Sequence, residues 1–334
     1  MADLAAQVAA NNTGIVEINA MIEQFGIETV HSYMNHVQDN AEECIRNAIV
    51  NLKEGKYEYE LDNGEYIRVR ITIDKIKREA TIDFSGTAPK NPFNYNAPMA
   101  VCHAVILYVF RTLVGNNIPL NEGCFKPLNI IIPNNSMINA KYPSAVIAGN
   151  TEVSQLTCNA LFGALGVIAG SQATMNNFIW GNDKIQNYET ICGGTGAGPN
   201  FHGTSAIQTH MTNTRSTDPE ILEARFPVRL EEYSIRKNSG GKGMFNGGDG
   251  VTRKLRFLEP MTVTTLCSHR KFQPFGLNGG EPGQCGKEWL EKKDGKFLWQ
   301  CFKCGKKIFV SQNIDDNICL LYTSPSPRDQ RGSR

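Results

Sequence analysis

The sequence predicts an α+β fold, with helices at the N-terminus, one buried helix of small residues, and mixed, mainly antiparallel sheets in the C-terminal half. Two observations support this prediction. Apolar residues recur at helical spacing through residues 1–55, whereas the period changes to two in "YIRVRITID" and in most segments after Pro227. Because helices and strands are segregated along the chain rather than alternating, a doubly wound parallel sheet is not expected.

The first 55 residues are expected to form two helices. The apolar residues of "GIVEINAMIEQF" follow helical spacing up to Gly26, a residue type suited to ending a helix. The next stretch keeps this spacing and is expected to end at Gly55. His31 and His36 are five residues apart, which places them on different sides of a helix, so they are not expected to share a metal.

The middle of the chain is expected to contain a hairpin, two helices and a strand. "YIRVRITID" and "EATIDFSG" alternate apolar and polar residues, which predicts a hairpin with one solvated face. "APMAVCHAVILYVFRTLVG" is apolar nearly all round and predicts a buried helix, and "CFKPLNIIIP" predicts a strand. "AGNTEVSQLTCNALFGALGVIAG" predicts a helix of small residues with Asn150 or Thr151 as its N-cap.

Short strands dominate the expectation for the rest of the chain. "NNFIWGN" and "QNYETICGG" predict strands, and "TDPEILEARFP" predicts a short helix with Asp218 as cap and Pro219 in its first turn. After Pro227, "VRLEEYSIRK", "VTRKLRF", "MTVTTLCS" and "EWLEKKDGKFLW" predict strands, with a hairpin turn at residues 293–295. Residues 1–316 are expected to form one region. The polar tail 317–334 is expected to be disordered and non-native, because "LYTSPSPRDQRGSR" resembles translated adapter sequence.

Composition argues against several classes of protein. The 334 residues carry a formal net charge of +1, so no overall field attracts nucleic acid or anionic lipid. The longest apolar run, "AVILYVF", is too short to cross a bilayer, and "MADLAAQVAANN" lacks the regions of a signal peptide. Ten cysteines without a regular framework favour a reducing compartment. The sequence therefore predicts a cytosolic protein with neither a nucleic-acid nor a membrane partner.

A glycine-rich stretch, "ETICGGTGAGPNFHGTSAIQTHMTNTR", is the first candidate for a ligand-binding loop. It lacks the dinucleotide-binding pattern G-x-G-x-x-G, and the chain has no Walker A motif. Its successive amides suit either an anion-binding nest or a cluster of β-turns. A second stretch, "NSGGKGMFNGGDG", contains Asp249, which suits either a metal ligand or an Asx-turn.

Several side chains near these loops are candidates for chemistry. His202, His210 and His269 are candidate acid–base groups, although a histidine in a loop is more often structural. Arg215 suits bidentate binding of a carboxylate or phosphate, and equally suits a structural role. Cys301 and Cys304 form a lone C-x-x-C pair without a second pair, so no metal site is predicted.

Several long stretches, in order, resemble the hydantoinase B/oxoprolinase family. They include "AQVAANNTGI", "IPLNEGCFKPLNIIIP", "YETICGGTGAGPNFHG", "THMTNTRSTDPEILEARFPVRLEEYSIRKNSGGKGMFNGGDGVTRKLRF" and "PFGLNGGEPG". The resemblance implies an enzyme that opens 5-oxo-L-proline to L-glutamate with hydrolysis of ATP, in the γ-glutamyl cycle of glutathione. It also implies that the ATP and Mg sites belong to a nucleotide-binding half outside this chain. The chain is therefore expected to be a fragment that is inactive alone and works in a homodimer.

The resemblance also implies roles for residues of the glycine-rich stretch. The residues expected to bind substrate are Arg215, Asn213, Thr212, Gly194, Gly196 and Gly198, and those expected to move protons are His210 and His202. Arg225 and Arg229 are alternatives for binding the carboxylate. Gln208 stands where relatives often have histidine, which weakens the case for a histidine pair. The alternative functions are a hydantoinase or acetone-carboxylase-type subunit, or a non-catalytic assembly half.

Overall fold

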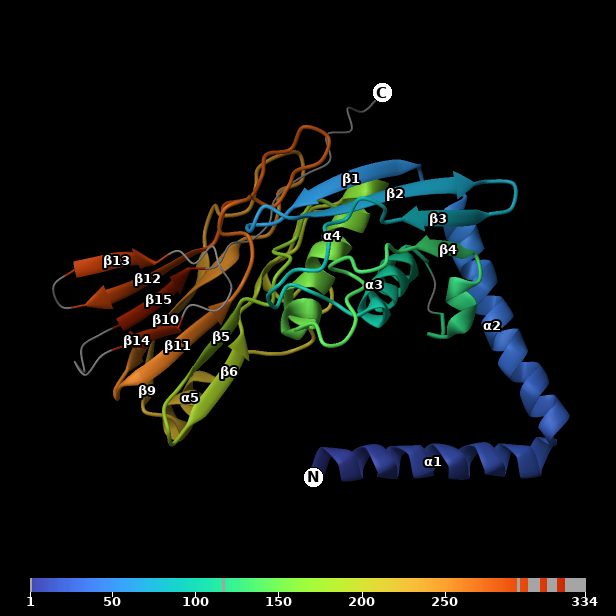
Figure 1. Ribbon diagram of the computed structural model, residues 1–334, viewed down its shortest axis with the longest axis horizontal. Coiled ribbons are helices and arrows are strands. Elements are labelled where there is room, and N and C mark those ends of the chain that lie inside the picture. The colour runs from blue at the N-terminus through green and yellow to red at the C-terminus, as the bar shows by residue number, and fades with distance from the viewer. Residues whose placement is uncertain (1, 116–117, 293–294, 300–306, 311–316, 322–334) are drawn as a thin grey trace. The chain divides into compact units, whose positions relative to one another are not determined.

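The computed structural model describes residues 2–115, 118–292, 295–299, 307–310 and 317–321 (Figure 1). The chain divides into two compact units. The first unit comprises residues 1–51, 74–80 and 110–129, and the second comprises residues 52–73, 81–109 and 130–334. The predicted α+β class is confirmed, because helices dominate the N-terminal stretch and strands dominate the C-terminal half.

The first unit begins with the two expected helices, α1 (Ala2–Phe25) and α2 (Ile27–Ile49). Gly26 separates them with a φ of 81°, which confirms its predicted role as a helix breaker. No side chain of α1 is buried, whereas α2 is amphipathic. The buried residues of α2 are Val30, Ala41, Ile45 and Ile49.

A short 3-10 helix, η1 (Glu122–Phe125), packs against α2 in the same unit. Gly123 permits this approach, since a Cβ atom there would lie 2.0 Å from the carbonyl oxygen of Gln38. Asn121 caps η1 by accepting the N–H of Gly123 at 2.9 Å.

The first sheet has the strand order β1-β2-β3-β4. Its strands are β1 (Gly55–Glu60), β2 (Tyr66–Asp74), β3 (Glu79–Asp83) and β4 (Leu128–Ile131). The expected strands β2, β3 and β4 are confirmed, whereas β1 was not expected. β2 alternates between buried and exposed side chains, as its sequence pattern predicts.

The prediction for Gly55 was wrong. Instead of ending α2, Gly55 begins β1, where it packs against the helix α4 (Ser154–Leu165). A Cβ atom at Gly55 would lie only 1.9 Å from the carbonyl oxygen of Ala164. The glycine therefore serves the contact between a strand and a helix, a long-range requirement that local pattern does not reveal.

Gly55→Ala is accordingly expected to lower the free energy of unfolding by about 1–3 kcal/mol, because β1 must move away from α4. Gly115→Ala is the matched control, since a Cβ atom there would meet nothing within 4 Å. Chemical denaturation of both variants measures the difference. Equal stability of the two variants would contradict this account of Gly55.

The helix of small residues is confirmed as α4, and nearly all of its side chains are buried. Its predicted start was wrong, because Asn150 and Thr151 lie in a π-helical turn, η2 (Gly149–Val153), that precedes Ser154. The turn places the Glu152 side chain in the interior, where Thr174 and Asn177 donate to its carboxylate at 2.9 Å each. These buried hydrogen bonds hold residues 149–153 against the interior, so neither Asn150 nor Thr151 serves as the N-cap of α4.

Two larger sheets lie in the C-terminal part of the second unit (Figure 1). Their orders are β13-β12-β15-β10-β9 and β14-β11-β5-β6, and every strand pairing determined within them is antiparallel. The strands are β5 (Asn177–Gly181), β6 (Gln186–Thr190), β9 (Val228–Arg236), β10 (Gly250–Phe257), β11 (Met261–Leu266), β12 (Lys287–Lys292), β13 (Gly295–Trp299), β14 (Lys307–Val310) and β15 (Asn317–Leu321). Apolar residues of both sheets share one core, which includes Phe178, Trp180, Val251, Leu255 and Val263.

The remaining expectations for the C-terminal half have mixed outcomes. The short helix α5 (Pro219–Arg225) is capped by Asp218, as predicted. β12 and β13 pair as expected, although the turn residues 293–294 lie outside the described residues, as do Cys301 and Cys304. The prediction of a disordered tail was wrong for residues 317–321, which form β15 and pair with β10 and β12. Residues 322–334 lie outside the described part, so disorder there stays a prediction. None of the described helices is long and apolar enough to cross a membrane.

Candidate functional site

The two glycine-rich stretches pack against each other. β7 (Gly193–Gly194) pairs with β8 (Ser205–Ile207), and the second stretch lies against both. A Cβ atom at Gly194 would lie 2.6 Å from the carbonyl oxygen of Gly248, and one at Gly248 would lie 2.1 Å from that of Thr204. Glycine is therefore required because three backbone segments approach closely at this point.

The glycines predicted to bind an oxyanion are buried in this packing. A Cβ atom at Gly196 would lie 1.9 Å from the carbonyl oxygen of Ala169, and one at Gly198 would meet the Phe201 ring. The Gly198 N–H donates to the carbonyl oxygen of Phe201 at 3.2 Å. Close packing thus accounts for these glycines and for Gly194, while ligand binding by their amides stays a prediction.

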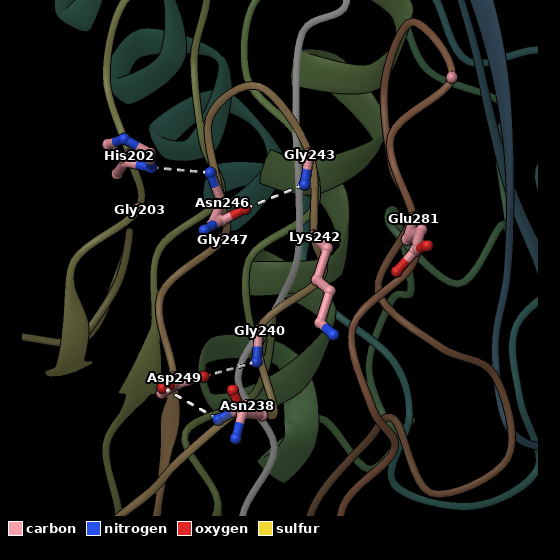
Figure 2. A pocket seen from close by; sticks show the side chains of 11 residues that line it. His202, Gly203, Asn238, Gly240, Lys242, Gly243, Asn246, Gly247, Asp249 and Glu281 are labelled. Carbon is pink, nitrogen blue, oxygen red and sulfur yellow. Dashed lines mark hydrogen bonds between the residues drawn. The ribbon is translucent and has the colours of Figure 1, made fainter.

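A pocket of about 680 Å³ lies where the two stretches meet (Figure 2). His202 lines it from the first stretch, and Lys242, Asn246 and Asp249 line it from the second. The Nδ1 atom of His202 accepts the backbone N–H of Asn246 at 2.8 Å, so in this arrangement the ring proton is on Nε2. The pocket therefore presents His202 as a hydrogen-bond donor.

Asp249 does not form the Asx-turn that the sequence left open as one of its two roles. Its carboxylate accepts backbone N–H groups from Asn238 at 3.2 Å and from Gly240 at 2.8 Å, so it joins the two ends of the second glycine-rich stretch. Within the described ranges, no three His, Cys, Asp or Glu side chains are grouped so that they could hold a metal ion.

His210 lies in a different environment from His202, and no hydrogen bond or ring contact between the two is found in the described part of the chain. His210 Nε2 and Asn159 Oδ1 are 3.1 Å apart, and the imidazole is packed beside the Phe162 ring with 5.3 Å between centroids. Burial lowers the pKa of His210 to about 4. The imidazole is therefore neutral near pH 7 and could accept a proton only at a large energetic cost.

A chain of buried hydrogen bonds connects His210 to His269. Asn159 accepts from His210 and donates through Nδ2 to the Tyr59 hydroxyl at 3.2 Å. Tyr59 in turn lies 2.6 Å from Nε2 of His269, whose Nδ1 donates to the carbonyl oxygen of Phe272 at 2.7 Å. Burial lowers the pKa of His269 as well. Each group in this chain has a partner, so the two histidines help to hold distant segments together.

The segment that carries the predicted substrate residues is anchored by α4. Gln155, one helical turn before Asn159, donates to the carbonyl oxygen of Thr209 at 3.2 Å and to the Thr212 hydroxyl. On the other side, Gln208 donates to the Thr190 hydroxyl at 2.9 Å. Thr212 is therefore buried in an anchor rather than open to a ligand.

Arg215 and Asn213 follow this anchor and are exposed. No hydrogen bond or ion pair joins the Arg215 side chain to any described residue. The structure therefore joins His210 and Thr212 to α4 by hydrogen bonds, leaves Arg215 and Asn213 at the surface, and places His202 in the pocket. It separates residues that the sequence interpretation had assigned to one site.

The sequence interpretation missed the polar face of α4 and the pocket residues Lys242 and Asn246. A signal for α4 was present, since "SQLTCNAL" carries several polar side chains within a helix that was expected to be buried. Buried polar groups need hydrogen-bond partners, so such a face predicts contacts with loops rather than with apolar residues.

Comparison with known proteins gives a consistent picture. The Hydantoinase B/oxoprolinase family matches residues 1–318. The chain is 40% identical to a 5-oxoprolinase of Dictyostelium discoideum over 335 aligned residues, covering 97% of this chain and 26% of that protein. It is 43% identical to 5-oxoprolinase 1 of Arabidopsis thaliana, covering 90% of this chain and 25% of that protein. The chain thus spans about a quarter of the length of these relatives.

The fold matches a solved structure as well. The ATP-dependent caprolactamase of Pseudomonas jessenii superposes with a TM-score of 0.79 at 20% identity, over 97% of this chain and 60% of that chain. At this identity the likeness establishes the fold alone, whereas the family match rests on nearly the whole sequence. The chain belongs to the hydantoinase B/oxoprolinase family.

Proposed function

We propose that this chain is part of an ATP-dependent 5-oxoprolinase, which opens 5-oxo-L-proline to L-glutamate in the γ-glutamyl cycle of glutathione. The observation that supports this most strongly is the 40% identity to a 5-oxoprolinase over 97% of the chain. The alternative, a subunit acting on another cyclic amide or on acetone, is less well supported, since the caprolactamase likeness is at 20% identity.

The reaction explains why an activating co-substrate is needed. Amide resonance stabilises the five-membered lactam against attack by water. Transfer of a phosphoryl group from ATP to the lactam oxygen would make the carbonyl carbon electrophilic. The protein must then bind the substrate carboxylate, stabilise the developing oxyanion and protonate the leaving nitrogen.

Residues of this chain suit parts of that task. Arg215 is exposed, has no partner among the described residues, and follows a segment anchored to α4, so it is available to bind a carboxylate. Asn213, exposed beside it, would assist. His210 is neutral and would act as a hydrogen-bonding group toward the substrate, while His202 is the second candidate and the one better suited to proton transfer.

We further propose that the chain works with a nucleotide-binding half of the same polypeptide, which supplies the ATP and Mg sites, in a cytosolic homodimer. The 26% coverage of the Dictyostelium relative supports a longer functional protein. In this proposal the chain is inactive alone. A non-catalytic assembly half is the second interpretation, and it requires that no residue of this chain contacts substrate.

A chimera tests the activity directly. Residues 1–318 of this chain would replace the matching segment of the Dictyostelium 5-oxoprolinase. The expected result is release of glutamate and ADP that requires both 5-oxoproline and ATP. Hydantoin and caprolactam serve as competing substrates. A folded chimera that hydrolyses ATP with either of these but not with 5-oxoproline would contradict the proposal.

Arg215→Lys in the chimera is expected to raise the KM for 5-oxoproline about tenfold, because lysine cannot make a bidentate contact with a carboxylate. Arg225→Lys and Arg229→Lys are matched controls that test the two alternatives. Initial rates across a range of 5-oxoproline concentrations separate KM from kcat. An unchanged KM for Arg215→Lys, with an increase in one of the other variants, would transfer the role to that arginine.

A further inference from the structure

The backbone on both sides of Arg215 is attached to the C-terminal sheets. Before Arg215, the hydroxyl of Thr214 is hydrogen-bonded to the hydroxyl of Thr190, at the end of β6. After it, the hydroxyl of Ser216 lies 2.8 Å from the hydroxyl of Tyr233 on β9. Arg215 therefore lies between two attached neighbours, while its own side chain is exposed and has no hydrogen bond or ion pair with any described residue.

Both attachments depend on adjacent residues of β6. The Thr190 hydroxyl accepts a hydrogen bond of 2.9 Å from Gln208, which leaves its own proton for the bond to the Arg215 segment. The preceding residue, Glu189, accepts two hydrogen bonds of 2.9 Å from Arg253, whose guanidinium lies 4.8 Å from the centre of the Tyr233 ring. One attachment is thus direct, and the other passes through a buried ion pair and a cation–π contact.

The Tyr233 hydroxyl is held in place and keeps its proton. Tyr233 is directly opposite Arg253 in the register of β9 and β10, so the backbone pairing and the guanidinium both locate its ring. Burial raises the pKa of Tyr233 to about 12, and the hydroxyl is therefore protonated near neutral pH. Sγ of Cys192 lies 3.3 Å from the same oxygen, so the hydroxyl can donate to one neighbour and accept from the other.

We propose that Tyr233 is a positioning residue, which holds the backbone at Arg215 so that the guanidinium meets the carboxylate of the lactam substrate. This inference rests on the proposed function, because it assigns Arg215 to that carboxylate. Arginine binds a carboxylate through two parallel hydrogen bonds, so its placement matters more than that of a point charge. A side chain on a fixed backbone also loses less freedom when it binds. Tyr233 itself contacts no substrate in this proposal.

Tyr233→Phe in the chimera that carries residues 1–318 removes the hydroxyl and keeps the ring beside Arg253. The KM for 5-oxoproline is expected to rise about fivefold with little change in kcat, because the lost bond orders a group that binds the substrate. Ser216→Ala removes the other partner of the same bond and should have the same effect. The double variant should be no worse than either single variant. Initial rates over a range of 5-oxoproline concentrations give these values.

Tyr188→Phe is the matched control, since Tyr188 lies on β6 and its hydroxyl donates to Asn177 instead of the Arg215 segment. Its KM should equal that of the starting chimera. A second comparison separates positioning from a general structural role. In a chimera with Arg215→Met, the further change Tyr233→Phe should leave kcat/KM unaltered, because the group that Tyr233 positions is gone.

Two results would overturn the positioning role while leaving the proposed function in place. One is an equal KM for Tyr233→Phe and Tyr188→Phe. The other is a loss of kcat/KM on Tyr233→Phe that is as large with Arg215→Met as without it. A folded starting chimera that does not act on 5-oxoproline would overturn both this inference and the proposed function. Thermal unfolding of each variant verifies that it is folded.

Discussion

Glu189→Gln is expected to lower the free energy of unfolding by about 3–5 kcal/mol. The carboxylate of Glu189 accepts two hydrogen bonds of 2.9 Å from Nε and Nη2 of Arg253, and the two side chains are only 4% and 1% exposed. Glutamine preserves the volume but removes the charge. The guanidinium would then remain in the interior without a counter-charge, and the Tyr233 ring 4.8 Å away could compensate only in part.

Urea denaturation of the variant measures this loss. The matched control is Glu231→Gln, which removes the partner of Arg256 on the same strand, β10. That pair is partly exposed, with 35% and 20% of the side chains accessible, so its loss is expected to cost less than about 1 kcal/mol. Similar costs for the two variants would contradict the importance of burial for the Arg253–Glu189 pair.

A pH-dependent gain in stability is expected for Glu152→Gln. Burial raises the pKa of Glu152 from its ordinary value of 4.5 to about 8, although Ser268, Thr174 and Arg270 act in the opposite direction. Between these values the folded chain holds a proton that the unfolded chain has released. This group therefore reduces the free energy of unfolding by about 1.4 kcal/mol per pH unit as the pH rises through that interval.

Glutamine resembles the protonated carboxyl in shape and hydrogen bonding, so the variant lacks this pH dependence. Its stability relative to the natural chain should increase from pH 5 to about pH 8 and then level off. Denaturation at a series of pH values gives the difference curve. Glu17→Gln, in the exposed helix α1, is the control and should show no such trend. A flat difference curve for Glu152→Gln would mean that the carboxyl is not held protonated.

Local features of the fold were predictable from the sequence. Gly26 ends a helix because glycine can adopt a positive φ, which depends only on that residue. Asp218 caps α5 by accepting a hydrogen bond from the N–H of Glu220, two positions away. The alternation in β2 is likewise local. Features that depend on distant partners were not predictable, such as the approach of Gly55 to Ala164 and the π-helical turn that directs Glu152 inward.

The same distinction applies to the candidate site. The glycine-rich stretches were recognised because glycine itself is informative about backbone approach. Their separation into a pocket around Lys242 and an anchor on α4 depends on contacts between residues far apart in sequence, such as Gln155 with Thr212. No spacing rule predicts that His202 and His210, eight residues apart, have different partners.

The anchoring of residues 209–212 by Gln155 and Asn159 has a consequence for how this region tolerates change. Apolar contacts have little directional preference, whereas a hydrogen bond made by a side-chain amide weakens steeply when its angle changes. Exchanges among neighbouring aliphatic residues should therefore leave the loop's position nearly unaltered. Removing one of the side-chain amides of α4, Gln155 or Asn159, should free residues 209–212 to move. The side chains that these residues carry would then lose their fixed positions.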